Sequence, residues 1–184
     1  MCTRTASILS VVLFNIEAAE LTVRYYNEAK VSTKALAFAV ETANRTLRQA
    51  GVKARWIDCY LDAAACKGDV ESAVVELTIA ADIQSEGVGN FAMGISLLPG
   101  VYAKVLWNRV TRYAKAFDVP VATVLGYVMA HEIGHLLMNT AAHAPEGVMK
   151  AVWTRTDTSL LAGGRMAFQG YEGAKMRRRL RGTR

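Results

Sequence analysis

Residues 121–138 read VATVLGYVMAHEIGHLLM. It is apolar nearly all round, which predicts a helix buried in the core. The pattern HExxH runs from His131 to His135. Because residues four apart share one face of a helix, the two imidazoles can bind the same metal ion. Glu132 follows the first histidine and can reach a metal-bound water instead of the metal.

A third histidine, His143, follows eight residues after His135, and the chain contains no others. A catalytic zinc usually has three protein ligands and one open position, so another donor must return to the helix. Asn139 is a suitable helix end because asparagine tolerates the left-handed conformation. Proximity and residue type favour His143 as the third ligand. The rival donors are Glu146, Asp157 and Glu172.

Two histidines and a carboxylate in an apolar helix are costly unless they are paired or bound to a metal. An accidental match, with satisfied core histidines, is the alternative. We therefore predict a zinc-dependent endopeptidase with one Zn²⁺ per chain. A metal-activated water would attack the peptide bond with Glu132 as general base. A catalytically inactive zinc-binding module is a further alternative, which the presence of Glu132 disfavours.

The rest of the chain predicts an α+β domain with one mixed sheet and the HExxH helix packed beneath it. Alternating apolar residues or short apolar runs predict strands at 21–26, 52–56, 74–79, 91–98 and 101–107. The stripe Leu36, Val40, Ala43 and Leu47 predicts a helix that starts at Ser32 or Thr33 and ends before Gly51. We expect a loop at 58–68, a short helix near 110–117, and a helix start marked by Asp118 and Pro120.

The run HEIGHLLMNTAAHAPEGVM at 131–149 resembles the metzincin metallopeptidases, and it is similar to a group of small bacterial metzincin-like proteins. That family's motif is HExxHxxGxxH followed by a methionine turn beneath the zinc. Met149 matches the methionine of that turn, whose role is structural, as a hydrophobic base for the metal site. The alternative is that Met149 only fills space in the core, which is the more common role of a methionine in a loop. The resemblance implies a zincin domain with a mixed twisted β-sheet, a backing helix and a buried active-site helix.

The sequence departs from this motif at two positions. Met138 stands where the family has glycine, and Ala141 stands where it has the third histidine. His143 lies two residues further on, so its role carries over less directly. If Glu172 were the ligand instead, the protein would be a gluzincin-type peptidase. The resemblance runs from about residue 21 to 153, and 154 onward stays unplaced.

In this family an extended peptide pairs with an exposed edge strand above the zinc. The segment 89–96 is our candidate for that edge, and a plain sheet strand is the alternative. We expect peptide or protein substrates, no membrane span and no nucleic acid. A basic nucleic-acid-binding domain is the competing interpretation, because much of the net charge of +6 lies in a tail from about 175. We expect that tail to be solvated and frayed.

Residues 1–19 have the shape of a signal peptide, with Arg4, an apolar run to Phe14 and small residues at Ala18 and Ala19. A first β-strand is the alternative. Residues 20–184 would then form a single catalytic domain. Cleavage would remove Cys2 and leave Cys59 and Cys66, a pair suited to an oxidising compartment, although two free thiols are also consistent. The protein would be secreted or periplasmic, or cytoplasmic if 1–19 is not a signal.

Overall fold

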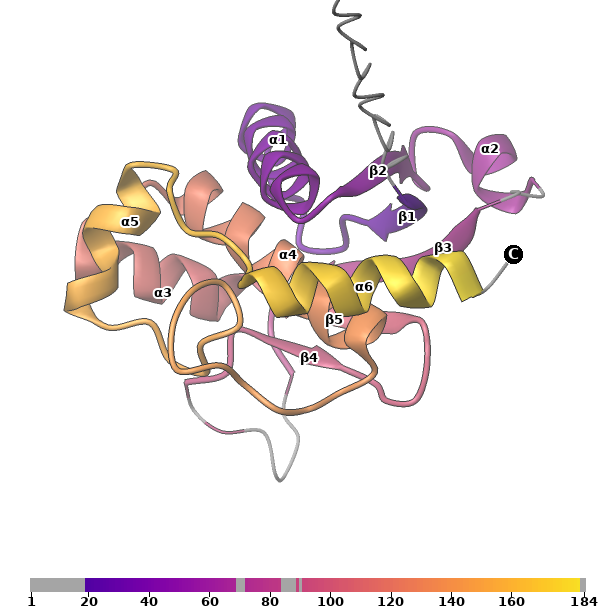
Figure 1. Cartoon of the computed structure of the whole chain (residues 1–184). Helices are drawn as coiled ribbons and strands as arrows, with labels where there is room; N and C mark the ends of the chain where they lie inside the picture. Colours follow the sequence, from indigo (N-terminus) through magenta and orange to yellow (C-terminus); the bar gives the residue numbers. More distant parts are fainter. Residues whose placement is uncertain (1–18, 69–71, 84–88, 90, 183–184) are drawn as a thin grey trace, which may run out of the picture.

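The computed structural model describes residues 19–68, 72–83, 89 and 91–182. The expected signal peptide falls on residues 1–19, so all of it except Ala19 lies outside these ranges. The described chain forms one five-stranded sheet in the order β2-β1-β3-β5-β4 (Figure 1), in which only β4 is antiparallel to its neighbour. The predicted α+β fold with a mixed sheet is therefore confirmed. The strands are β1 (Ala19–Tyr26), β2 (Val52–Asp58), β3 (Ala73–Ala80), β4 (Gly94–Ser96) and β5 (Tyr102–Leu106).

Helices α1 and α4 cover one face of the sheet. Apolar residues two apart along the parallel strands, such as Leu21 and Val23 in β1, join one hydrophobic core with both helices. The residues between them, such as Thr22 and Arg24, belong to the other face. Around the core the helices are α1 (Thr33–Gln49), α2 (Ala63–Lys67), α3 (Trp107–Phe117), α4 (Val121–Met138), α5 (Thr158–Ala162) and α6 (Gly170–Gly182), with a 3-10 turn at Arg155–Asp157.

Local sequence sets the ends of α1 as predicted. The Ser32 hydroxyl caps the first turn by accepting a hydrogen bond from the backbone N–H of Ala35 at 3.4 Å. After the last turn Gly51 adopts φ +76°, a conformation that glycine reaches without steric cost. The chain then enters β2, which lies parallel to β1.

Helix α4 crosses α1 at very close range. A Cβ on Gly126 would lie 2.5 Å from the backbone oxygen of Ala39, so the two helices meet where the sequence offers only small side chains. All but the first two residues of α4 are buried, as its apolar sequence predicts. Pro120 begins this helix and Asn139 ends it at φ 47°. Asp118, which we expected to mark the start of α4, instead ends α3 in the left-handed conformation at φ 53°.

Helix α4 is also the one described helix with the length and apolar composition that a membrane span would need. It lies almost wholly inside the fold, where core helices of this composition are common. Its burial against the sheet and α1 accounts for its sequence.

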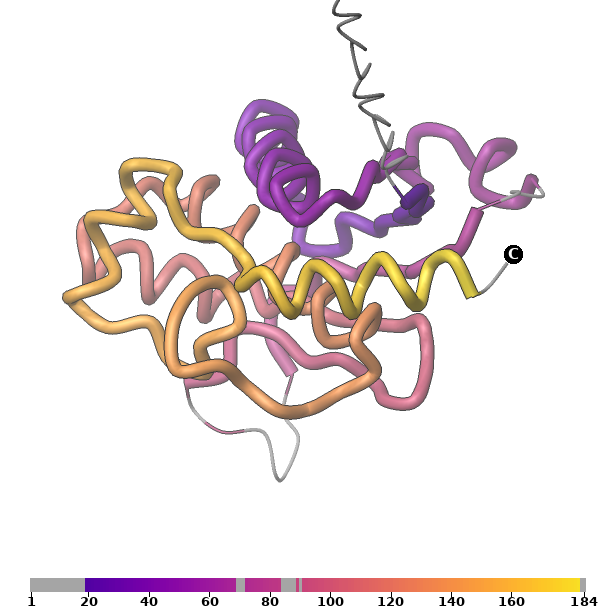
Figure 2. Tube along the Cα trace, in the orientation of Figure 1, coloured from indigo at the N-terminus to yellow at the C-terminus, as the bar shows by residue number. Residues whose placement is uncertain are grey.

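The tail that we expected to fray is helical as far as the structure describes it, to residue 182. It forms the end of α6, which lies along α4 and reaches β1 and β2, while basic side chains such as Lys175 and Arg178 are exposed, as expected of a solvated tail. Figure 2 shows this helix in yellow as the last described part of the chain. Met176 and Leu180, four residues apart, bury one face of α6. The Arg177 guanidinium donates a hydrogen bond to the backbone oxygen of Ala50 at 2.5 Å, at the end of α1.

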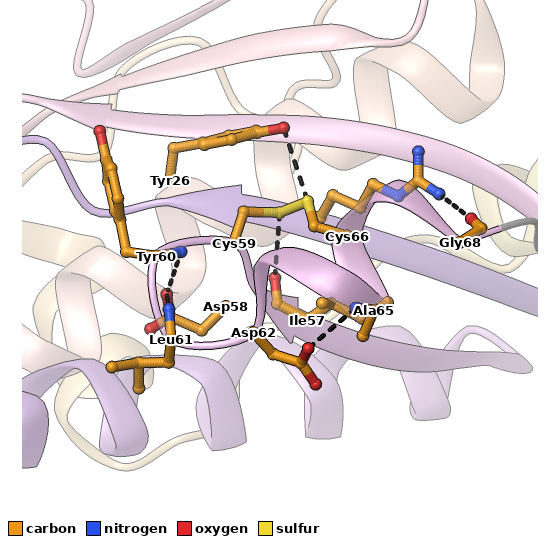
Figure 3. The surroundings of a disulfide bond; sticks show 11 residues. Tyr26, Ile57, Asp58, Cys59, Tyr60, Leu61, Asp62, Ala65, Cys66 and Gly68 are labelled. Carbon is orange, nitrogen blue, oxygen red and sulfur yellow. Dashed lines mark hydrogen bonds between the residues drawn. A yellow bond between two sulfur atoms is a disulfide. The ribbon is translucent and has the colours of Figure 1, made fainter.

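The expected loop after β2 contains the short helix α2 and a disulfide between Cys59 and Cys66 (Figure 3). Asp62 caps α2 by accepting the backbone N–H of Ala65 at 2.8 Å. The Tyr26 hydroxyl points at the Cys66 sulfur from the neighbouring strand at 3.6 Å, and it must be the donor because a disulfide sulfur carries no hydrogen. The bond closes a small second cluster with Ile57, away from the main core.

Candidate active site

The middle of α4 carries His131, Glu132 and His135, all of them buried. His143 stands in the loop after α4 and is exposed. One ring nitrogen from each of the three histidines lies within 4.8 Å of the others. The structure therefore brings together the three histidines that the sequence suggested, two on the helix and one on the returning chain.

Two backbone carbonyls fix the orientation of the helical histidines. His131 Nδ1 lies 2.7 Å from the backbone oxygen of Val148, and His135 Nδ1 lies 2.7 Å from that of Thr140. A carbonyl oxygen can only accept, so each Nδ1 carries the hydrogen and each neutral ring keeps its Nε2 lone pair free. The Thr140 carbonyl reaches His135 because Asn139 reverses the chain directly after the helix.

The two Nε2 atoms lie 3.0 Å apart. In neutral rings with hydrogen on Nδ1, both Nε2 atoms present lone pairs, so a single cation can bind between them. Burial lowers the pKa of His131 to about 3, with smaller contributions from the other two histidines, and burial also lowers the pKa of His135. The rings thus stay neutral, the state in which imidazole binds metal. This donor set fits a zinc ion.

Glu132 occupies a different environment from the histidines. Its carboxylate accepts a hydrogen bond from the Ser96 hydroxyl at 2.7 Å, and Ser96 lies on strand β4. Burial raises the pKa of Glu132 to about 7, while the bond from Ser96 acts in the opposite direction. Gly94, two residues earlier on β4, leaves room for this side chain, because a Cβ there would lie 2.5 Å from Glu132 Oε1. Sequence reasoning missed both β4 residues.

Met149 lies beneath the HExxH helix. It is buried, and a Cβ added to Gly134 would come within 2.7 Å of its sulfur. Gly147 makes this turn with φ +75°, and the backbone oxygen of Ala167 leaves no space for a side chain there. The chain after α4 therefore passes directly under the two helical histidines.

None of the three rival donors joins the histidine cluster. Both carboxylate oxygens of Glu172 are bonded at the start of α6, to the backbone N–H of Gln169 at 2.7 Å and the Tyr171 hydroxyl at 3.3 Å. The Asp157 carboxylate accepts from Lys150 Nζ at 2.7 Å. Glu146 is exposed on the loop that carries His143. Glu172, the distal carboxylate that a gluzincin-type site would use, is therefore bonded at the start of α6 and not to the histidine cluster.

A cavity of about 570 Å³ opens over the histidines, a size typical of ligand sites. One wall is β4, the edge strand of the described sheet, which occupies the end of the predicted segment 89–96. The apolar part of the lining includes Tyr113, Phe117 and Trp153. The Trp153 ring meets the His131 ring edge-on, with centroids 6.0 Å apart. The arrangement can hold a chain segment between an open strand edge and three convergent nitrogens.

By sequence, no family profile and no curated protein matches this chain. By structure, it is similar to a zinc-dependent peptidase from Methanocorpusculum labreanum, with a TM-score of 0.59 and 15% identity over 84% of this chain and 99% of that one. It is also similar to archaemetzincin from Methanopyrus kandleri, with a TM-score of 0.54 and 17% identity over 92% of this chain and 99% of that one. Metalloproteinase-II from Bacteroides fragilis is similar with a TM-score of 0.53 and 14% identity, over 89% of this chain and 54% of that one. At these identities the likeness establishes a shared fold.

Proposed function

We propose that this protein is a zinc-dependent endopeptidase. The observation that carries the proposal is the convergence of three histidine nitrogens beside a buried glutamate, in a cavity next to an open sheet edge. The solved structures that share the fold are named as zinc peptidases or metalloproteinases, which supports the same conclusion. His131, His135 and His143 would hold one zinc ion per chain, and Met149 would support them from below.

Zinc bound at these nitrogens would polarise a peptide carbonyl and lower the pKa of a bound water to about 7. Glu132 would accept a proton from the attacking water and deliver it to the leaving amine, so the carboxyl ends the cycle as it began. The Val148 and Thr140 carbonyls hold His131 and His135 in the tautomer that this role needs.

The open edge of β4 supports a peptide or protein substrate. An extended segment can pair with the backbone of an exposed strand and place one of its bonds over the histidines. The adjoining apolar wall of the cavity would receive a substrate side chain.

The decisive experiment compares purified wild type with Glu132→Gln and His131→Ala by metal analysis and by cleavage of a peptide library. Glu132→Gln should retain about one zinc per chain and lose turnover by roughly 10²-fold or more, because a general base contributes 10²–10⁴-fold. His131→Ala should lose zinc as well as activity. Turnover in Glu132→Gln at the wild-type rate would remove this residue from the mechanism, and full zinc occupancy in His131→Ala would contradict the ligand set.

Export remains part of the proposal. The Cys59–Cys66 disulfide supports an oxidising compartment such as the periplasm or the extracellular space. Most of the expected signal, residues 1–18, lies outside the described residues. The mass of the protein recovered from its native cell tests this point. A mature chain that begins near residue 20 would support processing, whereas a mass that includes residue 1 would contradict it.

A further inference from the structure

Strand β4 presents the same two residues both to the open edge and to Glu132. Leu97 N–H donates to the Tyr102 carbonyl at 2.9 Å, and Leu106 N–H donates to the Met93 carbonyl at 2.8 Å. In an antiparallel ladder, alternate residues bond to the neighbouring strand. The backbone groups of the intervening residues, Gly94 and Ser96, therefore face away from β5.

Side chains that alternate along a strand place positions 94 and 96 on one face. In β4 that face is directed at the catalytic helix. The Ser96 hydroxyl lies 2.7 Å from Glu132 Oε2 and 3.0 Å from the backbone oxygen of the same residue. Gly94 approaches Glu132 Oε1 so closely that a Cβ would lie 2.5 Å away. The residues available to pair with a peptide are thus the ones that confine the carboxylate.

We infer that Ser96 is a positioning residue that holds the Glu132 carboxylate in register with a peptide bound on β4. This inference rests on the proposed peptidase function and adds a residue to it. Nothing in the local sequence connects the two positions, which lie 36 residues apart.

A hydroxyl suits this role because it can both donate and accept. Ser96 has one hydrogen and two acceptors on Glu132, the carboxylate and the backbone oxygen. While the carboxylate is anionic, the hydroxyl donates to Oε2. When Glu132 has taken the proton from water, its O–H can donate to Ser96 Oγ, and the hydroxyl turns to the backbone oxygen. The tether therefore persists through both halves of the proposed proton transfer.

The test is the matched pair Ser96→Thr and Ser96→Val in the zinc-loaded full chain. The two side chains have nearly the same shape and both suit a strand, but only threonine keeps the hydroxyl. Ser96→Val should lower kcat by about 10–100-fold with KM changed by less than about twofold. Ser96→Thr should stay within about threefold of wild type for kcat. Zinc content should be equal in all, since no histidine is altered. Ser159→Ala, at an exposed position of α5, controls for the loss of a serine hydroxyl elsewhere.

A second measurement does not depend on turnover. Crystal structures of the metal-free proteins should show one position for the Glu132 carboxylate in wild type and Ser96→Thr, and several in Ser96→Val. Ser96→Ala gives the same comparison without added volume if the valine variant does not fold. A single, unchanged carboxylate position in the variants without the hydroxyl would overturn the inference, and so would wild-type kcat in Ser96→Val. If zinc-loaded wild type cleaves no peptide, the proposed function fails, and the carboxylate positions still decide the role of Ser96.

Discussion

Gly134 occupies a position in the HExxH helix where space is scarce. Its hydrogen faces Met149 Sδ and the Phe168 ring, and a Cβ would lie 2.7 Å and 2.8 Å from them. Both neighbours belong to the chain that passes beneath the helix. Packing against Met149 and Phe168 therefore favours glycine at position 134.

We predict that Gly134→Ala lowers the free energy of unfolding by about 1–3 kcal/mol, because added volume in a packed core forces its neighbours to move. Urea denaturation of the metal-free protein measures this change without a contribution from zinc. Gly170→Ala is the control, since a Cβ there meets no atom within 4 Å. If Gly134→Ala and Gly170→Ala have equal urea midpoints, Met149 and Phe168 move aside without a loss of stability.

Gly94 makes a similarly close approach, but its neighbour is the end of a flexible side chain. We predict that Gly94→Ala displaces the Glu132 carboxylate, lowers kcat by roughly tenfold or more, and leaves zinc content and unfolding midpoint near wild type. Steady-state kinetics beside metal analysis separates these effects. Unchanged kcat would mean that the carboxylate works equally well from a displaced position.

The sequence predicted the residues of the histidine cluster because a helix sets their spacing and the chain has no other histidines. The cluster in the structure contains the same three residues. Ser96 and Gly94 could not be predicted. Their contacts with Glu132 depend on how β4 packs against α4, and no local periodicity records a pairing between a strand and a distant helix.

At the level of elements, α6 explains why the end of the chain is ordered. Arg177 extends back to the end of α1 and donates to the Ala50 carbonyl at 2.5 Å. A helix end carries partial negative charge and carbonyls without intrahelical partners, so a guanidinium stabilises it. A residue of the basic tail thus caps a helix that lies 127 positions earlier.

We predict that Arg177→Met lowers the free energy of unfolding by about 1–2 kcal/mol through loss of this bond. Arg178→Met, on the exposed face of the same helix, should change it by less than about 0.5 kcal/mol. Thermal or urea unfolding of the two variants provides a matched comparison with equal loss of charge. If both variants unfold like wild type, the contact with Ala50 does not contribute to stability.

Helix α6 was not predicted, because charge dominated the interpretation of the tail and it was expected to be frayed. Arginines occupy 177, 178, 179 and 181, and such runs are usually solvated. The signal for a packed helix was nevertheless present in the spacing of Glu172, Met176 and Leu180, each four residues from the last, and all three are buried. In contrast, α1 and α4 were predicted well. Helix α1 has a long apolar stripe and a serine cap, and α4 is apolar nearly all round and ends at Asn139.

For the whole molecule, the buried histidines make stability depend on pH. Burial lowers the pKa of His131 from 6.5 to about 3 and also lowers the pKa of His135 and of His143. An unfolded histidine takes up a proton near pH 6.5, whereas folded His131 does so only near pH 3. The unfolded state therefore binds more protons in this window. We predict that the metal-free protein loses stability as pH falls from about 6.5 towards 3.

Glu132 acts in the opposite direction. Its pKa rises with burial from 4.5 to about 7, so between these values the folded state holds a proton that the unfolded state releases. This contribution favours folding as pH falls from 7 to 4.5. In Glu132→Gln it is absent, and the loss of stability between pH 6.5 and 4.5 should be steeper than in wild type. Urea midpoints measured across this range in a chelating buffer test both statements. A flat profile for both proteins would show that the rings are protonated in the fold.

The shortness of β4 limits what can attach to the border of the sheet. It spans Gly94–Ser96, and only its two end residues direct backbone groups outward. A strand this short offers few backbone groups with which a second copy of the chain could pair. It therefore disfavours the edge-to-edge aggregation that long exposed edge strands promote. If a peptide substrate pairs with β4 as proposed, so short a strand would contribute only a few main-chain hydrogen bonds. Specificity would then depend on the substrate side chain that enters the cavity beside Trp153.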